Sequence, residues 1–135
     1  MSATAIVRTL LLQRTSIAYL VDPSKIRVGE VPLRTGLPAI NITDLSANEI
    51  PTVSRQSLNT TIRARVQVTV YASTYQQQEE LLLVCKMGVG VHNGTLGNYT
   101  VDSVLPLDVG PAILPGDSGI YERSRDFMVT FKEAN

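Results

Sequence analysis

The segment from Thr60 to Met87 constrains the fold most, because it places a clear strand directly before a clear helix. Within Ile62–Tyr71, apolar and polar residues alternate strictly, with the period of two that is typical of a half-buried strand. The apolar face is predicted to carry Ile62, Ala64, Val66, Val68 and Val70, and the polar face Arg63, Arg65, Gln67, Thr69 and Tyr71. One face of this strand therefore meets a core, and the other meets water or a partner.

A helix is predicted to begin at Ser73, because Ser73-Thr74-Tyr75-Gln76 has the form of a capping box. The stripe of this helix expected to lie on the sheet is Tyr75, Leu82, Cys85 and Val89. Leu83 and Met87 point the other way. They are therefore candidates for a subunit contact, or for packing against a second helix of the same chain.

The rest of the chain adds a helix and several strands. Apolar residues at helical spacing from Ile6 to Ala18 predict an amphipathic helix that Asp22-Pro23 closes. The predicted strands are Ile26–Val31, Leu37–Thr43, Tyr99–Leu105 and Tyr121–Lys132, and the predicted long loops are Asp44–Asn59 and Asp108–Gly119.

This order of elements predicts an α+β fold in one domain that spans residues 1–135. An antiparallel or mixed sheet of about four to five strands is expected, with two helices packed on one face.

The outer face of this sheet is expected to be polar. Arg63 and Arg65 of the central strand would share it with Glu122 and Asp126 of the last strand, so opposite charges can pair across the two strands. Exposed pairs of this kind contribute roughly 0–1 kcal/mol. The face is therefore either simply solvated or a docking surface for another subunit. The candidate subunit interface is Arg63, Arg65, Leu83, Met87, Glu122 and Asp126.

Composition excludes several classes of protein. Twelve basic and twelve acidic side chains cancel, so we expect no positive field that would bind nucleic acid or an anionic membrane. A single cysteine, Cys85, allows no disulfide framework and is typical of a reducing cytosol. The N-terminal apolar run is short and interrupted by Arg8, unlike a signal peptide or a membrane span. These features favour a soluble, unexported protein.

The motifs that suggest chemistry do not fit an enzyme. Gly116-Asp117-Ser118-Gly119 resembles the nucleophile loop of chymotrypsin-like proteases, but Ile120 stands where that family has glycine. The single histidine, His92, lies in a glycine-rich turn with no evident carboxylate to orient it. One histidine and one cysteine do not make a metal cluster. We therefore expect no catalytic residue, no cofactor and no metal.

The order of the motifs carries more information than any one of them. In chain order they are Leu10-Leu11-Leu12, Leu37-Pro38-Ala39-Ile40, the strand from Arg63 to Ala72, Thr74-Tyr75, the Gly94 to Gly97 turn, Val101-Asp102-Ser103-Val104, and an ending from Asp117 to Arg123 and from Asp126 to Val129. In this order the chain resembles the tail-completion proteins of tailed bacteriophages, also called tail-terminator or head-to-tail joining proteins. The likeness spans almost the whole chain.

The resemblance implies a structural virion protein that forms a ring, typically a hexamer, on the head-proximal end of a finished tail tube. Such a ring stops tube polymerisation and joins the tail to the head. The implied partners are further copies of the chain, the tail tube protein and the head-closure or connector protein. DNA would pass through the ring without specific binding, which suits a neutral chain. The protein would assemble in the host bacterial cytoplasm and reside in the tail or neck of the virion.

Two alternatives stay open. Another neck component, such as a head-closure protein, would also form rings but would not have this order of helix, sheet, helix and sheet. A small dimeric ligand-binding α+β module would need a pocket with convergent polar groups, and the sequence indicates none.

Overall fold

The computed structural model describes residues 2–29, 36–50, 59–86, 94–96, 99–113 and 119–134. The strands are β1 (Ile26–Val28), β2 (Ala39–Ile50), β3 (Asn59–Ala72), β4 (Gly94–Leu96), β5 (Tyr99–Val109) and β6 (Tyr121–Ala134). The helices are α1 (Ser2–Leu12), α2 (Thr15–Leu20) and α3 (Tyr75–Val84), with a 3-10 helix, η1 (Pro23–Lys25).

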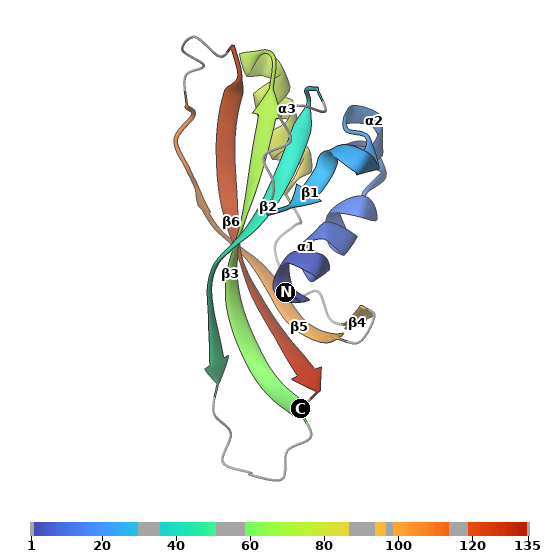
Figure 1. Ribbon diagram of the computed structural model, residues 1–135, viewed down its shortest axis with the longest axis vertical. Helices are drawn as coiled ribbons and strands as arrows, with labels where there is room; N and C mark the ends of the chain where they lie inside the picture. The colour runs from blue at the N-terminus through green and yellow to red at the C-terminus, as the bar shows by residue number, and fades with distance from the viewer. Residues whose placement is uncertain are drawn as a thin grey trace.

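The strands form a six-stranded mixed sheet in the order β1-β2-β3-β6-β5-β4 (Figure 1). β1 runs parallel to β2, and the other neighbouring strands are antiparallel. α1 packs on β1, β2 and β3, while α3 packs on β3 and β6. The predicted α+β class and mixed sheet are confirmed. β1 and β4 have only 3 residues each, so the sheet consists mainly of four long strands.

The core lies between the helices and the predicted face of β3. Ala64, Val66 and Val68 are fully buried, as are Phe127 and Phe131 of the neighbouring strand β6. These side chains are buried together because residues two apart in a strand point to the same face of the sheet. Burying such an apolar side chain contributes roughly 1.5–3 kcal/mol.

The second strand is longer than predicted. β2 continues to Ile50, so the prediction of a loop that begins at Asp44 is wrong for this part of the chain. Residues from Ser46 to Ile50 lack a hydrophobic period, but they pair with Arg65 to Thr61 of β3, whose backbone groups need partners on this side. The register shifts between Asp44 and Ser46, and this bulge accommodates the irregular sequence.

The last part of β5 was also predicted as loop. The strand continues to Val109, and Ile113 forms a further bridge with Glu122 of β6. A register shift between Pro106 and Val109 allows the strand to continue past the proline.

The N-terminal region forms two helices where the sequence predicts one. The break lies at Gln13 and Arg14, where the Arg14 amide donates a hydrogen bond to the carbonyl of Leu11 at 3.1 Å. The change of direction lets α2 pack against both α1 and α3. Among the described residues, no helix is long and apolar enough to cross a membrane.

The capping box of α3 lies one residue later than predicted. Thr74, and not Ser73, is the N-cap, and its hydroxyl accepts a hydrogen bond from the Gln77 amide at 3.1 Å. The side-chain oxygen of Gln77 in turn accepts from the amide of Ser73 at 3.0 Å. The motif predicts the helix start, but the side chain that reaches back is that of Gln77 and not Gln76, and it accepts from the residue before the N-cap.

Replacing Thr74 by alanine should lower the free energy of unfolding by about 1 kcal/mol, because one amide of the first helical turn loses its acceptor. Thr74→Ser keeps the hydroxyl and is the matched control, with a much smaller loss. Urea denaturation followed by circular dichroism measures both. Equal losses for the two variants would mean that the hydroxyl does not act as a cap.

Candidate assembly surfaces

Arg65, Asp126 and Asp108 form an ion cluster on the sheet face opposite the helices. The Nη2 and Nε atoms of Arg65 donate to the same oxygen of Asp126, at 2.6 and 3.1 Å. Nη2 also lies 3.5 Å from Oδ2 of Asp108. The hydrogen bond to Asp126 raises the pKa of Arg65. One guanidinium and two carboxylates leave the cluster with an excess of negative charge.

The two acids of this cluster differ in exposure. The side chain of Asp126 is only 11% exposed, whereas that of Asp108 is 84% exposed. The predicted pairing of opposite charges across β3 and β6 is confirmed by Arg65 and Asp126. Asp108 is not among the predicted residues of this face, because the sequence predicts a loop there.

The other two predicted residues of this face lie apart from the cluster. Arg63 is exposed and opposite Thr130, while Glu122 is opposite Tyr71 near the other end of the two strands. Burial, followed by the charge of Glu122, raises the pKa of Tyr71. The structure therefore brings Arg65 and Asp126 together, but not Arg63 and Glu122.

The helix candidate for an interface is Leu83 of α3, whose surface is 69% exposed. Met87, its predicted companion, lies outside the described residues. The alternative prediction is that Leu83 packs against a second helix of the same chain. α2 does pack against α3, but it leaves Leu83 exposed. The stripe toward the sheet contains Leu81 in place of Tyr75, which is 52% exposed. A subunit contact at Leu83 stays a prediction.

Two arginines on the helix side of β6, Arg123 and Arg125, contact α3 and are not among the predicted site residues. Arg125 Nη1 donates to the carbonyl of Leu82 at 3.1 Å, near the C-terminus of α3, where positive charge is favourable. Arg123 Nη1 lies 2.9 Å from Glu79 Oε1. These contacts join α3 to β6. The alternation that places Phe127 on the core face also places both arginines there. Their position on the helix side could therefore be predicted from the sequence.

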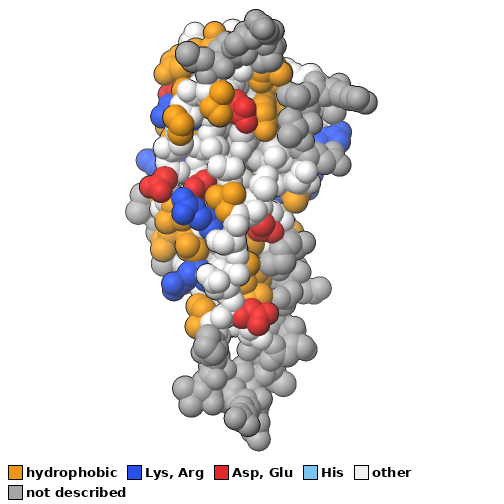
Figure 2. All heavy atoms as spheres, turned by 60° about the vertical axis from the view of Figure 1, so that its left-hand side comes forward, with side chains coloured by type: hydrophobic (Ala, Val, Ile, Leu, Met, Phe, Trp, Pro, Cys, Tyr) orange, Lys and Arg blue, Asp and Glu red, His pale blue; other side chains and the backbone are white. Residues whose placement is uncertain are grey.

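The C-terminal part of β5 forms an open edge of the sheet. Among the described residues, β4 pairs with β5 only from Tyr99 to Val101. Beyond that point Leu105, Leu107 and Val109 are exposed by 42, 40 and 42%. Figure 2 shows one side of the molecule, where hydrophobic side chains lie among positively and negatively charged side chains. Strand edges that are unpaired in this way can bind another chain through their backbone groups.

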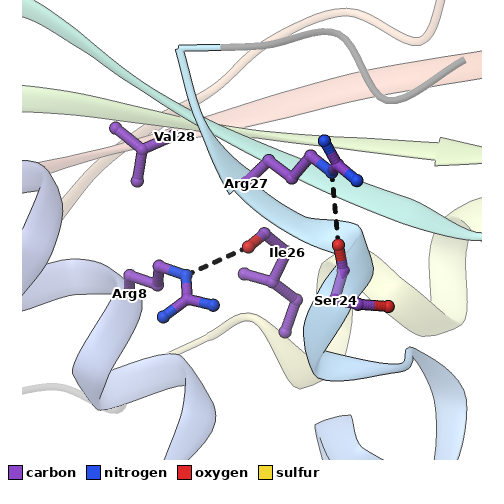
Figure 3. Close-up of a pocket in the computed structure, with 5 residues that line it drawn as sticks. All are labelled: Arg8, Ser24, Ile26, Arg27 and Val28. Carbon is purple, nitrogen blue, oxygen red and sulfur yellow. Dashed lines mark hydrogen bonds between the residues drawn. The ribbon is translucent and has the colours of Figure 1, made fainter. Parts of the chain in front are cut away.

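An open hollow of about 330 Å³ lies on the opposite side of the sheet, at the β1 edge (Figure 3). Its lining residues are Arg8, Ser24, Ile26, Arg27 and Val28. Arg8 Nε donates to the Ile26 carbonyl at 3.0 Å, and Arg27 Nε donates to the Ser24 carbonyl at 3.2 Å. These bonds hold each side chain in place. Among the described residues that line it, two are arginines and none is acidic.

Of the groups that suggest chemistry, the structure describes Cys85, which is buried. Burial raises the pKa of Cys85 to about 12, so its thiol stays protonated at neutral pH. His92 and Ser118 lie outside the described residues. Within the described ranges, no three His, Cys, Asp or Glu side chains are grouped so that they could hold a metal ion.

The fold is α+β, with a mixed sheet that the described helices cover on one face. It is similar to the fold of a chain in a solved structure described as the virion of a native gene transfer agent particle. The TM-score is 0.67 and the identity 8%, and the match covers 93% of this chain and 91% of that chain. No protein-family model and no curated protein sequence matches the chain.

Proposed function

We propose that the chain is a structural protein of a virion and that it acts by assembly, without performing a reaction. The observation that carries this proposal is the fold shared with a virion chain over 93% of the length. At 8% identity the two chains have few side chains in common. The role that they can share is therefore one that depends on shape.

The finer proposal is a tail terminator. In this role, copies of the chain form a closed ring at the head-proximal end of a tail tube, stop its growth and join it to the head connector. The order of sequence motifs described above supports this role. The α+β sheet also supports it, because the described helices pack on one face and leave side chains of the other face, such as Arg63, exposed.

A closed ring needs two different surfaces on each subunit, because every copy contacts one neighbour with each of them. The chain offers different surfaces on different elements. One is the outer sheet face around Arg65 and Asp126, and another is the exposed side of α3 at Leu83.

The charge of the chain supports passage of DNA through such a ring. The twelve basic and twelve acidic side chains cancel. Each phosphate that a protein neutralises strengthens its binding to DNA, so a strongly basic ring would oppose movement of the genome. A neutral subunit avoids this resistance.

The test is to add the purified chain to tail tubes of the parent virus and examine them by negative-stain microscopy. We expect a ring at one end of each tube and no further growth when tube protein is supplied. Rings that bind only to isolated head connectors would instead favour a head-closure protein. Tubes with bare ends and unchanged growth would contradict the proposal.

Leu83→Asp should abolish assembly if α3 contributes to the subunit contact, because the charge would have to lose its water on burial. The variant should stay folded, since Leu83 is 69% exposed. Glu80→Gln, at another exposed position of α3, is the control and should assemble normally. Light scattering gives the mass of each purified variant, and microscopy gives the fraction of capped tubes. Normal mass and capping for Leu83→Asp would remove α3 from the interface.

A further inference from the structure

We propose that copies of the chain join through the edges of their sheets, so that the end of β5 in one subunit pairs, backbone to backbone, with the end of β2 in the next. The sheet then continues from one copy to the following copy. This inference rests on the proposed ring and names the two strands that form a subunit contact in it.

The end of β2 is an exposed strand edge. β1 pairs with β2 only at Ile40, Asn41 and Ile42, and beyond Ile42 no other described residue pairs with β2 on the side away from β3. Residues 45–49 are all exposed, and Leu45 among them is 48% exposed. The backbone N–H and C=O groups along such an edge can pair with another strand.

The end of β5 is a second exposed edge, on the other side of the sheet. β4 pairs only with the first three residues of β5, and in the described part of the chain β6 is the one neighbouring strand beyond them. Leu105, Leu107 and Val109 are exposed here. Pro106 supplies no N–H, so pairing on this edge rests on the residues on either side of it. An exposed apolar edge strand favours the binding of a further strand.

The directions of the strands suit a contact between these two edges. β2, β3, β6 and β5 lie side by side, and each is antiparallel to its neighbour. β2 and β5 of one subunit therefore run in opposite directions. If the next subunit continues the sheet, its β2 is antiparallel to β5 of the first subunit, and the antiparallel alternation extends across the contact.

A second copy of the chain fits as the partner, because each copy has one edge of each kind. β3 and β6 separate the two edges within a subunit, and Figure 1 shows the end of β2 at the lower left and the end of β5 at the upper left. A contact between edges at different heights staggers each copy against the next. Closing a sheet into a barrel requires such a stagger. The contact is heterologous, so it forms a ring if the rotation closes.

Hydrogen exchange tests the contact on the native chain, because an amide that gains a stable hydrogen bond exchanges more slowly. Mass spectrometry compares the chain at low concentration with the chain assembled at high concentration or on tail tubes. We expect exchange in 43–50 and in 103–109 to become slower on assembly. β3, which already pairs on both sides, is the internal control and should exchange slowly in both states.

Two blocking variants show whether the contact is heterologous. Ala47→Lys on β2 and Leu107→Lys on β5 each place a charge on one edge, as natural edge strands do to prevent pairing. Each variant alone should lose all species above the monomer. An equal mixture should form dimers and nothing larger, because such a pair retains one intact edge of each kind.

Thr100→Lys is the matched control for the blocking variants. Thr100 is exposed but lies where β4 already pairs with β5, so this variant should assemble normally. Light scattering gives the mass of each variant, and circular dichroism shows whether it is folded. If a blocking variant does not fold, the exchange measurement on the native chain decides alone.

Four outcomes would overturn the inference. They are assembly that leaves exchange in either segment unchanged, a chain that associates neither at high concentration nor on tail tubes, blocking variants that assemble normally, and a mixture of folded blocking variants that stays monomeric. Slower exchange in both segments without capping of tail tubes would contradict the proposed function and keep the contact. Capping without slower exchange would keep the function and reject this contact.

Discussion

Replacing Phe127 by alanine should lower the free energy of unfolding by about 3–5 kcal/mol. Phe127 is fully buried on the helix side of β6, opposite Val66 of β3, which is also fully buried. Alanine there removes the ring from the core and leaves a cavity that the surrounding strands can close only in part. Because a domain is stable by only about 5–15 kcal/mol, this change should lower the urea midpoint strongly.

Lys132→Ala, on the same strand but at an exposed position, is the control for the Phe127 variant and should change stability by less than about 0.5 kcal/mol. If Phe127→Ala does not fold, Phe127→Leu should fold with an intermediate loss. A loss of less than about 1 kcal/mol for Phe127→Ala would contradict the assignment of this face as the core.

The strands and faces around Phe127 could be predicted because their pattern is local and regular. Strict alternation in β3 indicates which side chains face the core, and the same alternation in β6 places Phe127 and Phe131 beside them. The capping motif predicted the start of α3 to within one residue, because a cap depends only on neighbouring residues.

The extra length of β2 could not be predicted from its own residues. Ser46 to Ile50 contain no period, and asparagine and glutamate are uncommon in strands. The segment is a strand because β3 extends beside it and pairs with it from Thr61 to Arg65. Its structure therefore depends on a tertiary contact, which overrides local propensity.

The candidate surfaces could be predicted only in part, for the same reason. The contact between Arg65 and Asp126 followed from two strand patterns and an assumed antiparallel register. The hollow between Arg8 and Arg27 has no sequence pattern, because it forms only where α1 meets β1. The bulge that exposes Asp108 depends on how β5 pairs with β6 around Pro106.

Asp126→Ala should lower the free energy of unfolding by about 1.5–3 kcal/mol, the usual contribution of hydrogen bonds to a charged group. The variant removes the acceptor of two hydrogen bonds from Arg65, and the side chain that it removes is 11% exposed. The side chain of Arg65 is 37% exposed, so water can replace part of what is lost. The loss should therefore be smaller than for a fully buried ion pair.

Asp108→Ala is the matched control, because it removes the other carboxylate beside the same guanidinium. Its side chain is 84% exposed and its distance to Arg65 is 3.5 Å, so we expect a change of only about 0–1 kcal/mol in stability. The two variants thus separate two contributions within one cluster: Asp126 fixes Arg65 by two hydrogen bonds, and Asp108 adds only an exposed contact. Denaturation of both variants measures the difference, and equal losses would show that the two acids hold Arg65 to the same extent.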